Sequence, residues 1–313
     1  MRVLIPGGSG QVGTILARRL HAQGHEVTVL SRYPQTMPWR SLPWDGASPG
    51  TWAYLLDSTD VVINLAGRSV DCRYTEPNRA QILRSRIEST HVLGECIARA
   101  KTPPSLWLNA STATIYRHAY ERPQDDITGE LGGKEPNAPF TWRFSIDVAT
   151  KWEDAFFSAN TPNTRKVALR SAMTMSPDPG GVFSVLSRLV KLGLGGTAGS
   201  GDQYVSWIHH RDFTRAIDFL IEHEELDGPI NLCSPHPLPN NEFMSELRKA
   251  WGQSIGLPAK EWMIEFGAFF LRTESELILK SRRVIPTRLI NAGFDFQFPT
   301  WPEAAQHLVK DAR

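Results

Sequence analysis

Four glycines near the start of the chain, Gly7, Gly8, Gly10 and Gly13, have the spacing of a loop that binds the phosphates of a dinucleotide. A side chain at Gly10 would hold a pyrophosphate away from the backbone N–H groups, and the N-terminus of a following helix favours negative charge. The alternative is a tight turn with a purely structural role. Because an apolar run precedes the glycines and helical spacing follows them, we favour the dinucleotide loop. Its expected cofactor contacts are Gly7, Gly10, Gln11, Val12 and Gly13.

The residues after the second apolar run indicate which dinucleotide is bound. A fold that selects NAD normally carries Asp or Glu at this point, where it hydrogen-bonds the adenosine ribose 2′-OH. This chain has Ser31 and Arg32 instead. A guanidinium matches a 2′-phosphate in charge and in bidentate geometry, so the sequence predicts NADP(H) as the cofactor. The alternative interpretation of Arg32 is a solvated arginine at the end of a strand.

Alternating strands and helices are expected to position these residues. Short apolar runs indicate strands at 3–5, 26–30, 61–65, 106–110 and 166–170. Helical patterns follow the glycine loop and recur at 76–101, 142–160 and 183–192. This alternation predicts the α/β class, with a doubly wound parallel sheet of the Rossmann type.

A change of composition near residue 192 suggests a second, smaller lobe. Residues 192–202 contain five glycines in eleven positions, which indicates a flexible loop. Beyond it we predict a strand at 205–208, a helix with Asp212 as its N-cap, and a short strand at 230–232, with both strands returning to the sheet. The predicted division is an NADP(H)-binding domain at 1–175, completed by 205–232, and a smaller C-terminal α/β lobe at 176–204 and 233–313.

The composition favours a small-molecule partner. Lys and Arg total 34 against 33 Asp and Glu, so no excess of charge favours nucleic acid or an anionic membrane. The three cysteines are far apart and predict neither a disulfide framework nor a metal site, which fits a reducing, cytoplasmic location. No apolar run approaches the roughly 20 residues that cross a bilayer, and the first residues lack the features of a secretory signal.

Several motifs together resemble one protein family. The glycine loop and the Asn-Leu-Ala-Gly sequence at 64–67 resemble the short-chain dehydrogenase/reductase superfamily. More narrowly, the chain resembles the atypical epimerase family group SDR39U1/YfcH, with its DUF1731-type C-terminal region, in the motifs GGSGQVG, VVINLAG, LGLGGTAGSGDQYVSWIHHRDF and SRRVIPTRLINAGFDFQFP. The resemblance covers nearly the whole chain. It implies a Rossmann sheet of about seven parallel strands, with NADP(H) in a cleft beside the smaller lobe.

The family resemblance also implies roles for further residues. The catalytic hydroxyl falls on Thr112, and the lysine beside the nicotinamide ribose falls on Lys151. In the superfamily a tyrosine four residues before this lysine relays the proton, whereas this chain has Asp147 there. Asp147 would pair with Lys151 and would act as a base more readily than as an acid, which puts ordinary carbonyl reduction in question. The implied cofactor contacts are Ser31, Arg32, Leu65, Ala66, Gly67, Gln81, Arg86 and Lys151.

Four aromatic or imidazole side chains are candidates for lining the substrate cleft: Tyr116, Trp142, Trp207 and His209. The alternative for each is packing in the core, and a histidine at a strand-to-helix junction commonly only packs. Adjacent His209 and His210 on a strand would point to opposite faces, so no metal is expected there. The arginines at 282 and 283 are expected in a solvated turn.

Two functions of different class follow from these residues. The first is an NADP(H)-dependent oxidoreductase or epimerase that acts on an unidentified small molecule, in which Thr112 polarises a carbonyl or hydroxyl group and Lys151 orients the cofactor. The alternative is a non-catalytic NADP(H)-binding protein that senses redox state or binds a partner, which the missing tyrosine favours. A nucleotide-sugar epimerase or dehydratase ranks below both, because such enzymes depend on that tyrosine. By analogy with the fold, the long predicted helices could form a homodimer interface.

Overall fold

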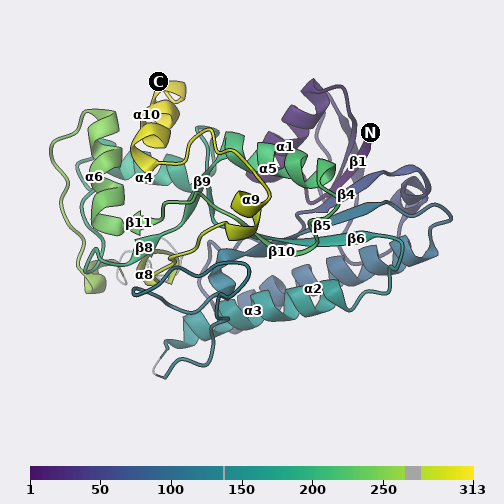
Figure 1. Ribbon diagram of the computed structural model, residues 1–313, viewed down its shortest axis with the longest axis horizontal. Coiled ribbons are helices and arrows are strands. Elements are labelled where there is room, and N and C mark those ends of the chain that lie inside the picture. The colour runs from purple at the N-terminus through teal and green to yellow at the C-terminus, as the bar shows by residue number, and fades with distance from the viewer. Residues whose placement is uncertain (137, 265–275) are drawn as a thin grey trace.

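A seven-stranded sheet forms the centre of the computed structural model, which describes residues 1–136, 138–264 and 276–313 (Figure 1). Its strands are β1 (Arg2–Pro6), β2 (Glu26–Ser31), β3 (Arg40–Pro43), β4 (Val61–Asn64), β5 (Leu106–Thr112), β6 (Arg165–Ser171) and β10 (Gly228–Leu232). Neighbouring strands are parallel, in the order β10-β6-β5-β4-β1-β2-β3. The order reverses between β1 and β4, which is the switch point where Rossmann folds bind their ligands. The predicted α/β fold class is confirmed.

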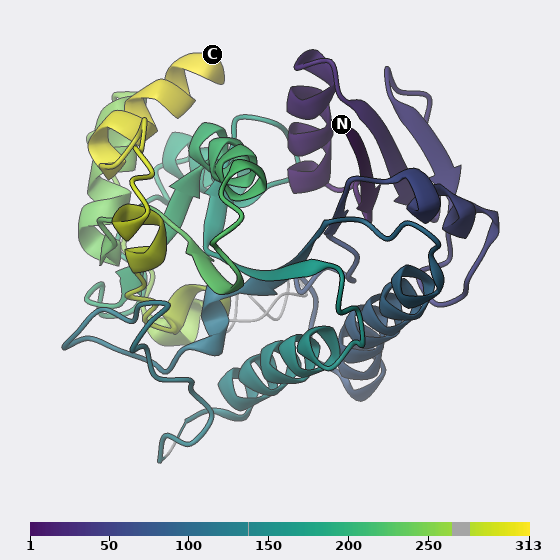
Figure 2. The same ribbon diagram turned by 45° about the vertical axis from the view of Figure 1, so that its right-hand side comes forward.

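Helices cover both faces of the sheet (Figures 1 and 2). On one face lie α2 (Glu76–Arg99) and α3 (Phe140–Phe157), and on the other lie α1 (Gln11–Ala22) and α5 (His210–Glu222). The short 3₁₀ helix η1 (Thr51–Ser58) joins β3 to β4, and η2 (Ala113–Ile115) follows β5. Among the helices that the structure describes, none combines the length and the apolar character needed to span a bilayer.

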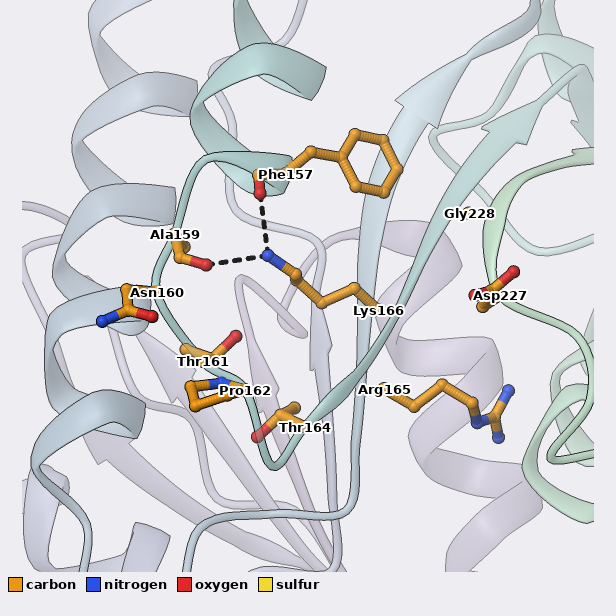
Figure 3. Close-up of a pocket in the computed structure, with 10 residues that line it drawn as sticks. All are labelled: Phe157, Ala159, Asn160, Thr161, Pro162, Thr164, Arg165, Lys166, Asp227 and Gly228. Carbon is orange, nitrogen blue, oxygen red and sulfur yellow. Dashed lines mark hydrogen bonds between the residues drawn. The ribbon is translucent and has the colours of Figure 1, made fainter.

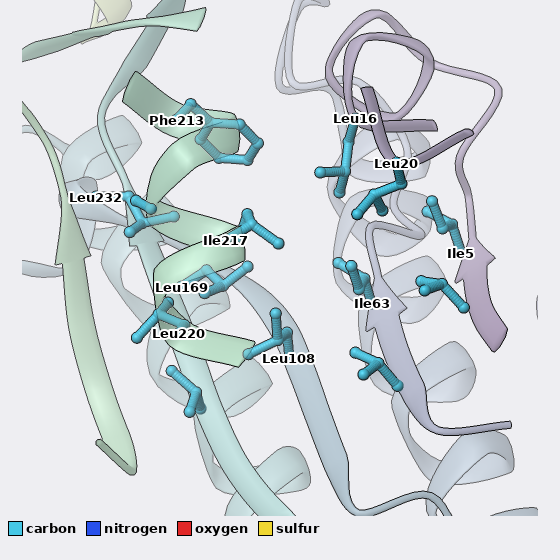
Figure 4. Close-up of a cluster of buried hydrophobic side chains, with 14 of the residues drawn as sticks. Ile5, Leu16, Leu20, Ile63, Leu108, Leu169, Phe213, Ile217, Leu220 and Leu232 are labelled. Atoms are coloured by element: carbon cyan, nitrogen blue, oxygen red, sulfur yellow. The ribbon is translucent and has the colours of Figure 1, made fainter. Parts of the chain in front are cut away.

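The central strands are continuous apolar runs because both of their faces are buried. Val3 and Ile5 of β1 enter the core beneath α1 and α5, whereas Leu4 enters the core on the α2 and α3 side. Figure 4 shows the first of these cores, in which Leu16 of α1 and Phe213 of α5 approach the strands. Burying a side chain of this size stabilises the fold by about 1.5–3 kcal/mol. The two cores fix the strands side by side. Because the strands are parallel, their carboxyl ends lie along the same end of the sheet.

A second lobe contains α4 (Val182–Lys191), α6 (Asn240–Trp251) and α10 (Trp301–Asp311), gathered around an apolar core of their own. Its strands form short pairs: β7 (Met173–Met175) with β9 (Trp207–His209), and β8 (Tyr204–Val205) with β11 (Leu238–Pro239). The strand predicted at 205–208 does not return to the main sheet, so that prediction is wrong. The main sheet contains instead a strand that was not predicted, β3. It has no apolar run because it lies at the sheet edge and is partly exposed.

The C-terminal residues 276–313 pack against both lobes. They contain α8 (Glu276–Leu279) and α9 (Thr287–Asn291), and Leu289 of α9 joins the core beneath α1 and α5, whereas α10 belongs to the second lobe. Asp212 holds this tail, because its carboxylate accepts the N–H groups of Gln297 and Phe298 at 2.8 Å each. The predicted N-cap at Asp212 is therefore wrong. Helix α5 begins at His210, two residues before Asp212, and His209 is its N-cap.

Candidate cofactor and active site

Three glycines of the loop between β1 and α1 have different surroundings. Gly7 has a φ of 75° and lies against Ala66, whose nitrogen would be 2.5 Å from a Cβ at this position. A Cβ on Gly13 would lie 2.5 Å from the Cα of Gly8, so Gly13 allows α1 to pack closely on the loop. A Cβ on Gly10 would meet no protein atom closer than 4.0 Å. Gly10 is therefore the position at which the loop leaves space for a phosphate.

The first turn of α1 presents N–H groups to this space. Its N-cap is Gly10, which makes no side-chain cap, and the first turn contains no acidic residue. A helix N-terminus carries partial positive charge and favours an anion. The side-chain amide of Gln11 is directed elsewhere, because it donates to the carbonyl oxygen of Asp178 at 2.8 Å. The phosphate contacts predicted at Gln11 and Val12 stay predictions, and the side-chain amide nitrogen of Gln11 is already engaged.

The end of β2 carries a cation that is exposed to solvent. The Ser31 hydroxyl donates to Ser9 Oγ at 2.8 Å, which joins this strand end to the glycine loop. Arg32 is exposed and has no hydrogen bond or ion pair within the part of the chain that the structure describes. It adjoins a cavity of about 440 Å³ lined also by Tyr33 and by residues 43–45 and 48–52. This cavity lies beyond β2 and β3, on the side of the sheet edge where Rossmann folds hold the adenosine half of the cofactor.

The loop after β4 lies beside the glycine loop. Asn64 is buried, donates to Asn109 Oδ1 at 2.7 Å and accepts the Ala66 N–H at 3.1 Å. These bonds turn the chain at the strand end and hold Ala66 against Gly7. The predicted contacts at 65–67 are thereby brought next to the space above Gly10.

Arg86 of α2 is a cation without a carboxylate partner among the described residues. Its guanidinium lies 5.0 Å from the ring centroid of Trp152 and donates to the carbonyl oxygens of Arg68 and Ile82. Burial lowers the pKa of Arg86 to about 10. A Cβ on Gly67 would lie 3.3 Å from this guanidinium, so Arg86 is close to the predicted cofactor loop. Its charge is therefore available to an anion.

Gln81 is engaged with the protein itself. Its side-chain oxygen accepts a hydrogen bond from Arg68, which also donates to Asn78 at 2.8 Å. Arg68 follows the loop at 65–67, so Gln81 supports that loop from α2. The direct cofactor contact predicted for Gln81 stays a prediction.

The residues assigned to chemistry lie on β5 and α3. Thr112 ends β5, and its Oγ1 accepts the Thr114 N–H at 3.1 Å. Lys151 Nζ lies 2.8 Å from Asp147 Oδ2, and each of these side chains is 50% exposed. The predicted pairing of Asp147 with Lys151 is therefore present. Because both side chains reach solvent, the pair can exchange partners with a bound molecule.

Tyr116 lies in the protein interior, 1% exposed. Its hydroxyl donates to Asn231 Oδ1 at 2.9 Å and accepts from Arg170 Nη1 at 2.9 Å. Burial raises the pKa of Tyr116 to about 12. Both hydrogen-bonding functions of the hydroxyl are therefore occupied, and the substrate-lining role predicted for Tyr116 finds no support in this position.

Arg170 also makes a buried ion pair that the sequence analysis did not predict. It donates to both carboxylate oxygens of Glu153, at 2.9 Å and 2.7 Å, and Ser111 donates to the same carboxylate at 2.5 Å. The pair joins α3 to β5 and β6 directly behind Thr112 and Lys151. The available signal was an arginine within an apolar strand, because a buried cation needs a partner.

Two further residues predicted to line the cleft, Trp207 and His209, belong to β9 and are completely buried. Trp207 packs on Trp301 at 5.0 Å between ring centroids. His209 stacks on Phe298 at 3.9 Å, and its Nδ1 accepts the Arg211 N–H and so caps α5. For both residues the alternative of core packing describes the structure, and the predicted substrate contact finds no support in these positions. Trp142 is partly exposed near the start of α3, and its ring packs against that of His118 at a tilt, with 4.6 Å between the ring centroids.

The rings of His209 and His210 lie on the same side, stacked at 4.6 Å. The expectation that they point to opposite faces is wrong because His210 is already the first residue of α5. No group of three or more side chains suited to hold a metal ion occurs in residues 1–136, 138–264 and 276–313.

Two cations of the C-terminal segment reach the residues after Thr112. Lys280, 2% exposed, donates to the Thr114 carbonyl oxygen at 2.7 Å, and burial lowers the pKa of Lys280 to about 7. Arg282 donates to Thr114 Oγ1 at 3.0 Å and pairs with Glu276 at 2.7 Å. The expected solvated turn is therefore wrong for Arg282, whose side chain is 11% exposed.

A second cavity, of about 470 Å³, lies at the opposite edge of the sheet (Figure 3). It is lined by residues at the start of β6 and β10 and by the loop after α3. Its cations are already engaged: Lys166 donates to the carbonyl oxygens of Phe157 and Ala159, at 2.9 Å and 2.8 Å, and Arg165 to that of Leu220. This cavity is therefore separate from the glycine loop and from Thr112.

Two family profiles match the chain, one after the other. The NAD dependent epimerase/dehydratase family matches residues 3–233, and a domain of unknown function, DUF1731, matches residues 261–308. The human epimerase family protein SDR39U1 is 32% identical over 314 residues, which cover 99% of this chain and 100% of the relative. An epimerase family protein of Staphylococcus epidermidis is 30% identical over 309 residues, with 99% of each chain covered.

Solved structures show the same fold. The crystal structure of human epimerase family protein SDR39U1 (isoform 2) with NADPH matches with a TM-score of 0.86 at 30% identity, over 99% of this chain and 100% of that chain. A UDP-N-acetylglucosamine 4-epimerase from Bacillus cereus matches with a TM-score of 0.76 over 100% of this chain and 99% of that chain. Its identity is 15%, so it shows a likeness of fold alone.

Proposed function

This chain belongs to the NAD dependent epimerase/dehydratase family, and on that premise we propose that it binds NADP(H) and transfers hydride, as an oxidoreductase or epimerase, to or from a small molecule. The observation that carries the proposal is the glycine loop. The protein packs tightly at Gly7 and Gly13 but leaves open space at Gly10, next to the free N–H groups of α1. A loop that served only as a tight turn would not need this space.

The preference for NADP(H) over NAD(H) rests on Arg32. It is an exposed guanidinium at the end of β2, where an NAD-selecting fold carries a carboxylate. The human relative described above was crystallised with NADPH, which supports the same preference. Arg86 provides a second cation beside the loop at 65–67, and its charge has no carboxylate partner in the described part of the chain.

Thr112 is suited to donate a hydrogen bond to a substrate oxygen. Its Oγ1 accepts the Thr114 N–H, so its own hydrogen is free to point toward a carbonyl. NADP(H), when bound, supplies or accepts the hydride. Asp147 occupies the position of the superfamily's tyrosine and is an ion-paired carboxylate, which takes up a proton more readily than it gives one. This arrangement supports proton removal from an alcohol more directly than proton delivery to a carbonyl.

Two measurements test the proposal in sequence. The first is titration of the purified protein with NADPH and with NADH, where tighter binding of NADPH is expected. The second follows nicotinamide absorbance of the NADP(H)-loaded protein as a deproteinised cell extract is added, with Thr112→Ala and Lys151→Ala variants as controls. Turnover by the wild type alone would support an enzyme. If neither dinucleotide binds, the proposal is wrong.

A second candidate is a protein that binds NADP(H) without turnover. The observation that favours it is the position of Tyr116, whose hydroxyl is fully engaged in the interior, together with Asp147 at the place of the usual tyrosine. In this case NADPH would bind tightly, and no fraction of the extract would change its absorbance. Binding would then stabilise the fold by mass action and signal the redox state to a partner.

A further inference from the structure

A short strap, residues 176–181, joins β7 to α4 and is tied to the first helix of the glycine loop. Gln11 Nε2 donates to the Asp178 carbonyl oxygen at 2.8 Å, and Arg18 Nη1 lies 3.2 Å from Asp178 Oδ1. Ser176 donates to the other carboxylate oxygen of Asp178 at 3.0 Å. A Cβ on Gly181 would lie 2.2 Å from the Gln11 amide, so the strap also packs directly on this side chain.

The position of these contacts links the strap to the phosphate space. Gln11 is the first residue of α1 and immediately follows Gly10, where the loop leaves room for a ligand. Arg18 lies two turns further along the same helix. The strap is therefore attached along α1, beginning at the turn whose N–H groups face that space. Two elements far apart in the sequence thus meet where a pyrophosphate would be held.

We propose that Asp178 is a positioning residue for the dinucleotide: through Gln11 and Arg18 it holds the strap 176–181 against the glycine loop and slows the release of NADP(H). This inference rests on the proposed function, since it concerns the residence time of that cofactor. The strap carries two prolines, Pro177 and Pro179, which restrict its backbone.

The size of the effect follows from the exposure of the ion pair. The Arg18 side chain is 59% exposed and that of Asp178 is 26% exposed. Exposed ion pairs are weak, and their loss corresponds to a change of up to about five-fold in an equilibrium or rate constant. The pair therefore contributes little to the stability of the fold, and its removal is expected to act on the cofactor without unfolding the protein.

The experiment measures the dissociation rate of NADPH by stopped-flow fluorescence, with excess NADP⁺ as the displacing ligand. The variants are Arg18→Ala, Asp178→Ala, their combination, and the conservative Arg18→Lys. The matched control is Arg19→Ala, which removes a cation at the next position of α1 that pairs with Asp218 of α5 at 2.6 Å and not with the strap. Thermal unfolding without cofactor is followed for every variant.

We expect Arg18→Ala and Asp178→Ala to raise the dissociation rate by about two- to five-fold each, with no further rise in the double variant because both remove the same interaction. Arg18→Lys should restore most of the wild-type rate, and Arg19→Ala should leave it unchanged. A purely structural role would instead lower the unfolding temperature and leave the dissociation rate alone.

The outcomes separate the two proposals. Unchanged dissociation in both Arg18→Ala and Asp178→Ala, or an equal rise in Arg19→Ala, would overturn the role of the strap while NADPH binding by the wild type stands. If the wild-type protein shows no detectable binding of NADPH, the proposed function is overturned, and the cofactor role of Asp178 falls with it.

Discussion

Two buried histidines should make this protein sensitive to acid. His209 is 0% exposed and stacks between His210 and Phe298. Burial lowers the pKa of His209 to about 2 and that of His210 to about 4. The Nε2 atoms of both rings are buried without a hydrogen-bond partner in the described structure, so no acceptor would receive a hydrogen bond from a proton added there. Both imidazoles are therefore neutral in the folded protein.

The sign and size of the effect follow from proton linkage. In the unfolded chain a histidine titrates near its ordinary pKa of about 6.5, so below that pH the unfolded state binds a proton that the folded state does not. Stability is complete above pH 6.5 and is lost as the pH falls toward the folded pKa of each residue. Each unit costs about 1.4 kcal/mol per histidine, so at about pH 5 each contributes a loss of about 2 kcal/mol, and the pair about 4 kcal/mol.

The charged groups around the cluster do not cancel this loss. His210, His307 and Arg211 lower the pKa of His209 further. Asp311 of α10 lies 3.4 Å from His307 Nδ1 and pairs with Arg211 at 3.4 Å. Asp178 and Asp311 raise the pKa of His210, but burial and the charge of Arg211 exceed their effect. The cluster joins β9 and the start of α5 to α10, because the His209 ring also contacts that of His307.

The assay is urea unfolding at about pH 7 and about pH 5, followed by tryptophan fluorescence, for the wild type and His209→Asn. Asparagine is a good N-cap and keeps an acceptor for the Arg211 N–H. The variant will be less stable at both pH values because the ring contacts are lost, but the loss between the two pH values should be smaller by about 2 kcal/mol. His91→Asn, on an exposed face of α2, is the control. An equal pH dependence in wild type and His209→Asn would refute the reasoning.

Three further predictions concern the cofactor loop and the buried ion pair. Arg32→Ala should weaken NADPH binding by about 10- to 100-fold and leave NADH binding nearly unchanged, as measured by titration calorimetry; an unchanged preference would contradict a 2′-phosphate contact. Gly10→Ala should abolish NADPH binding without altering the unfolding temperature, because its Cβ would meet no protein atom closer than 4.0 Å. Gly13→Ala should instead destabilise the fold, because its Cβ would lie 2.5 Å from the Cα of Gly8. The opposite pattern in the two variants would rule out the assigned glycine roles. Glu153→Gln should lower the free energy of unfolding by about 3–5 kcal/mol, because it leaves the buried Arg170 without its charge partner. Urea unfolding measures this loss, and a change below about 1 kcal/mol would contradict the prediction.

The sheet was predictable from the sequence to the extent that its strands are buried on both faces. Residues 3–5, 61–63 and 106–108 are continuous apolar runs for this reason, and each lies in a strand of the main sheet. The edge strand β3 is partly exposed and carries Arg and Ser, so no apolar run marked it. Residues 205–208 are mostly apolar too, but they lie in the short pairs β8–β11 and β7–β9 outside the main sheet. Hydrophobicity alone does not distinguish a central strand from another buried one.

The candidate site was predictable where one local motif defines it. The glycine loop and Arg32 each occupy a few consecutive residues, so their positions follow from the βαβ order. The pair of Asp147 with Lys151 follows from helical spacing, because residues four apart lie on one face. The contacts of Tyr116 join residues 54 and 115 positions away, and His209 is enclosed by Phe298 and His307 from the end of the chain. No local pattern records such contacts, which is why both residues were assigned to the cleft.

The C-terminal segment is part of the candidate active site rather than a separate appendage. Thr114 is held on its carbonyl by Lys280 and on its hydroxyl by Arg282, while its N–H bonds the Thr112 oxygen. The orientation of the Thr112 hydroxyl therefore depends on two residues that belong to the DUF1731 match and lie more than 160 positions away. Removing that segment would leave the carbonyl and hydroxyl oxygens of Thr114 without these two hydrogen-bond donors. The epimerase-type region is therefore not expected to keep its site when it is expressed alone. This dependence gives a physical reason for the two regions to occur in one chain.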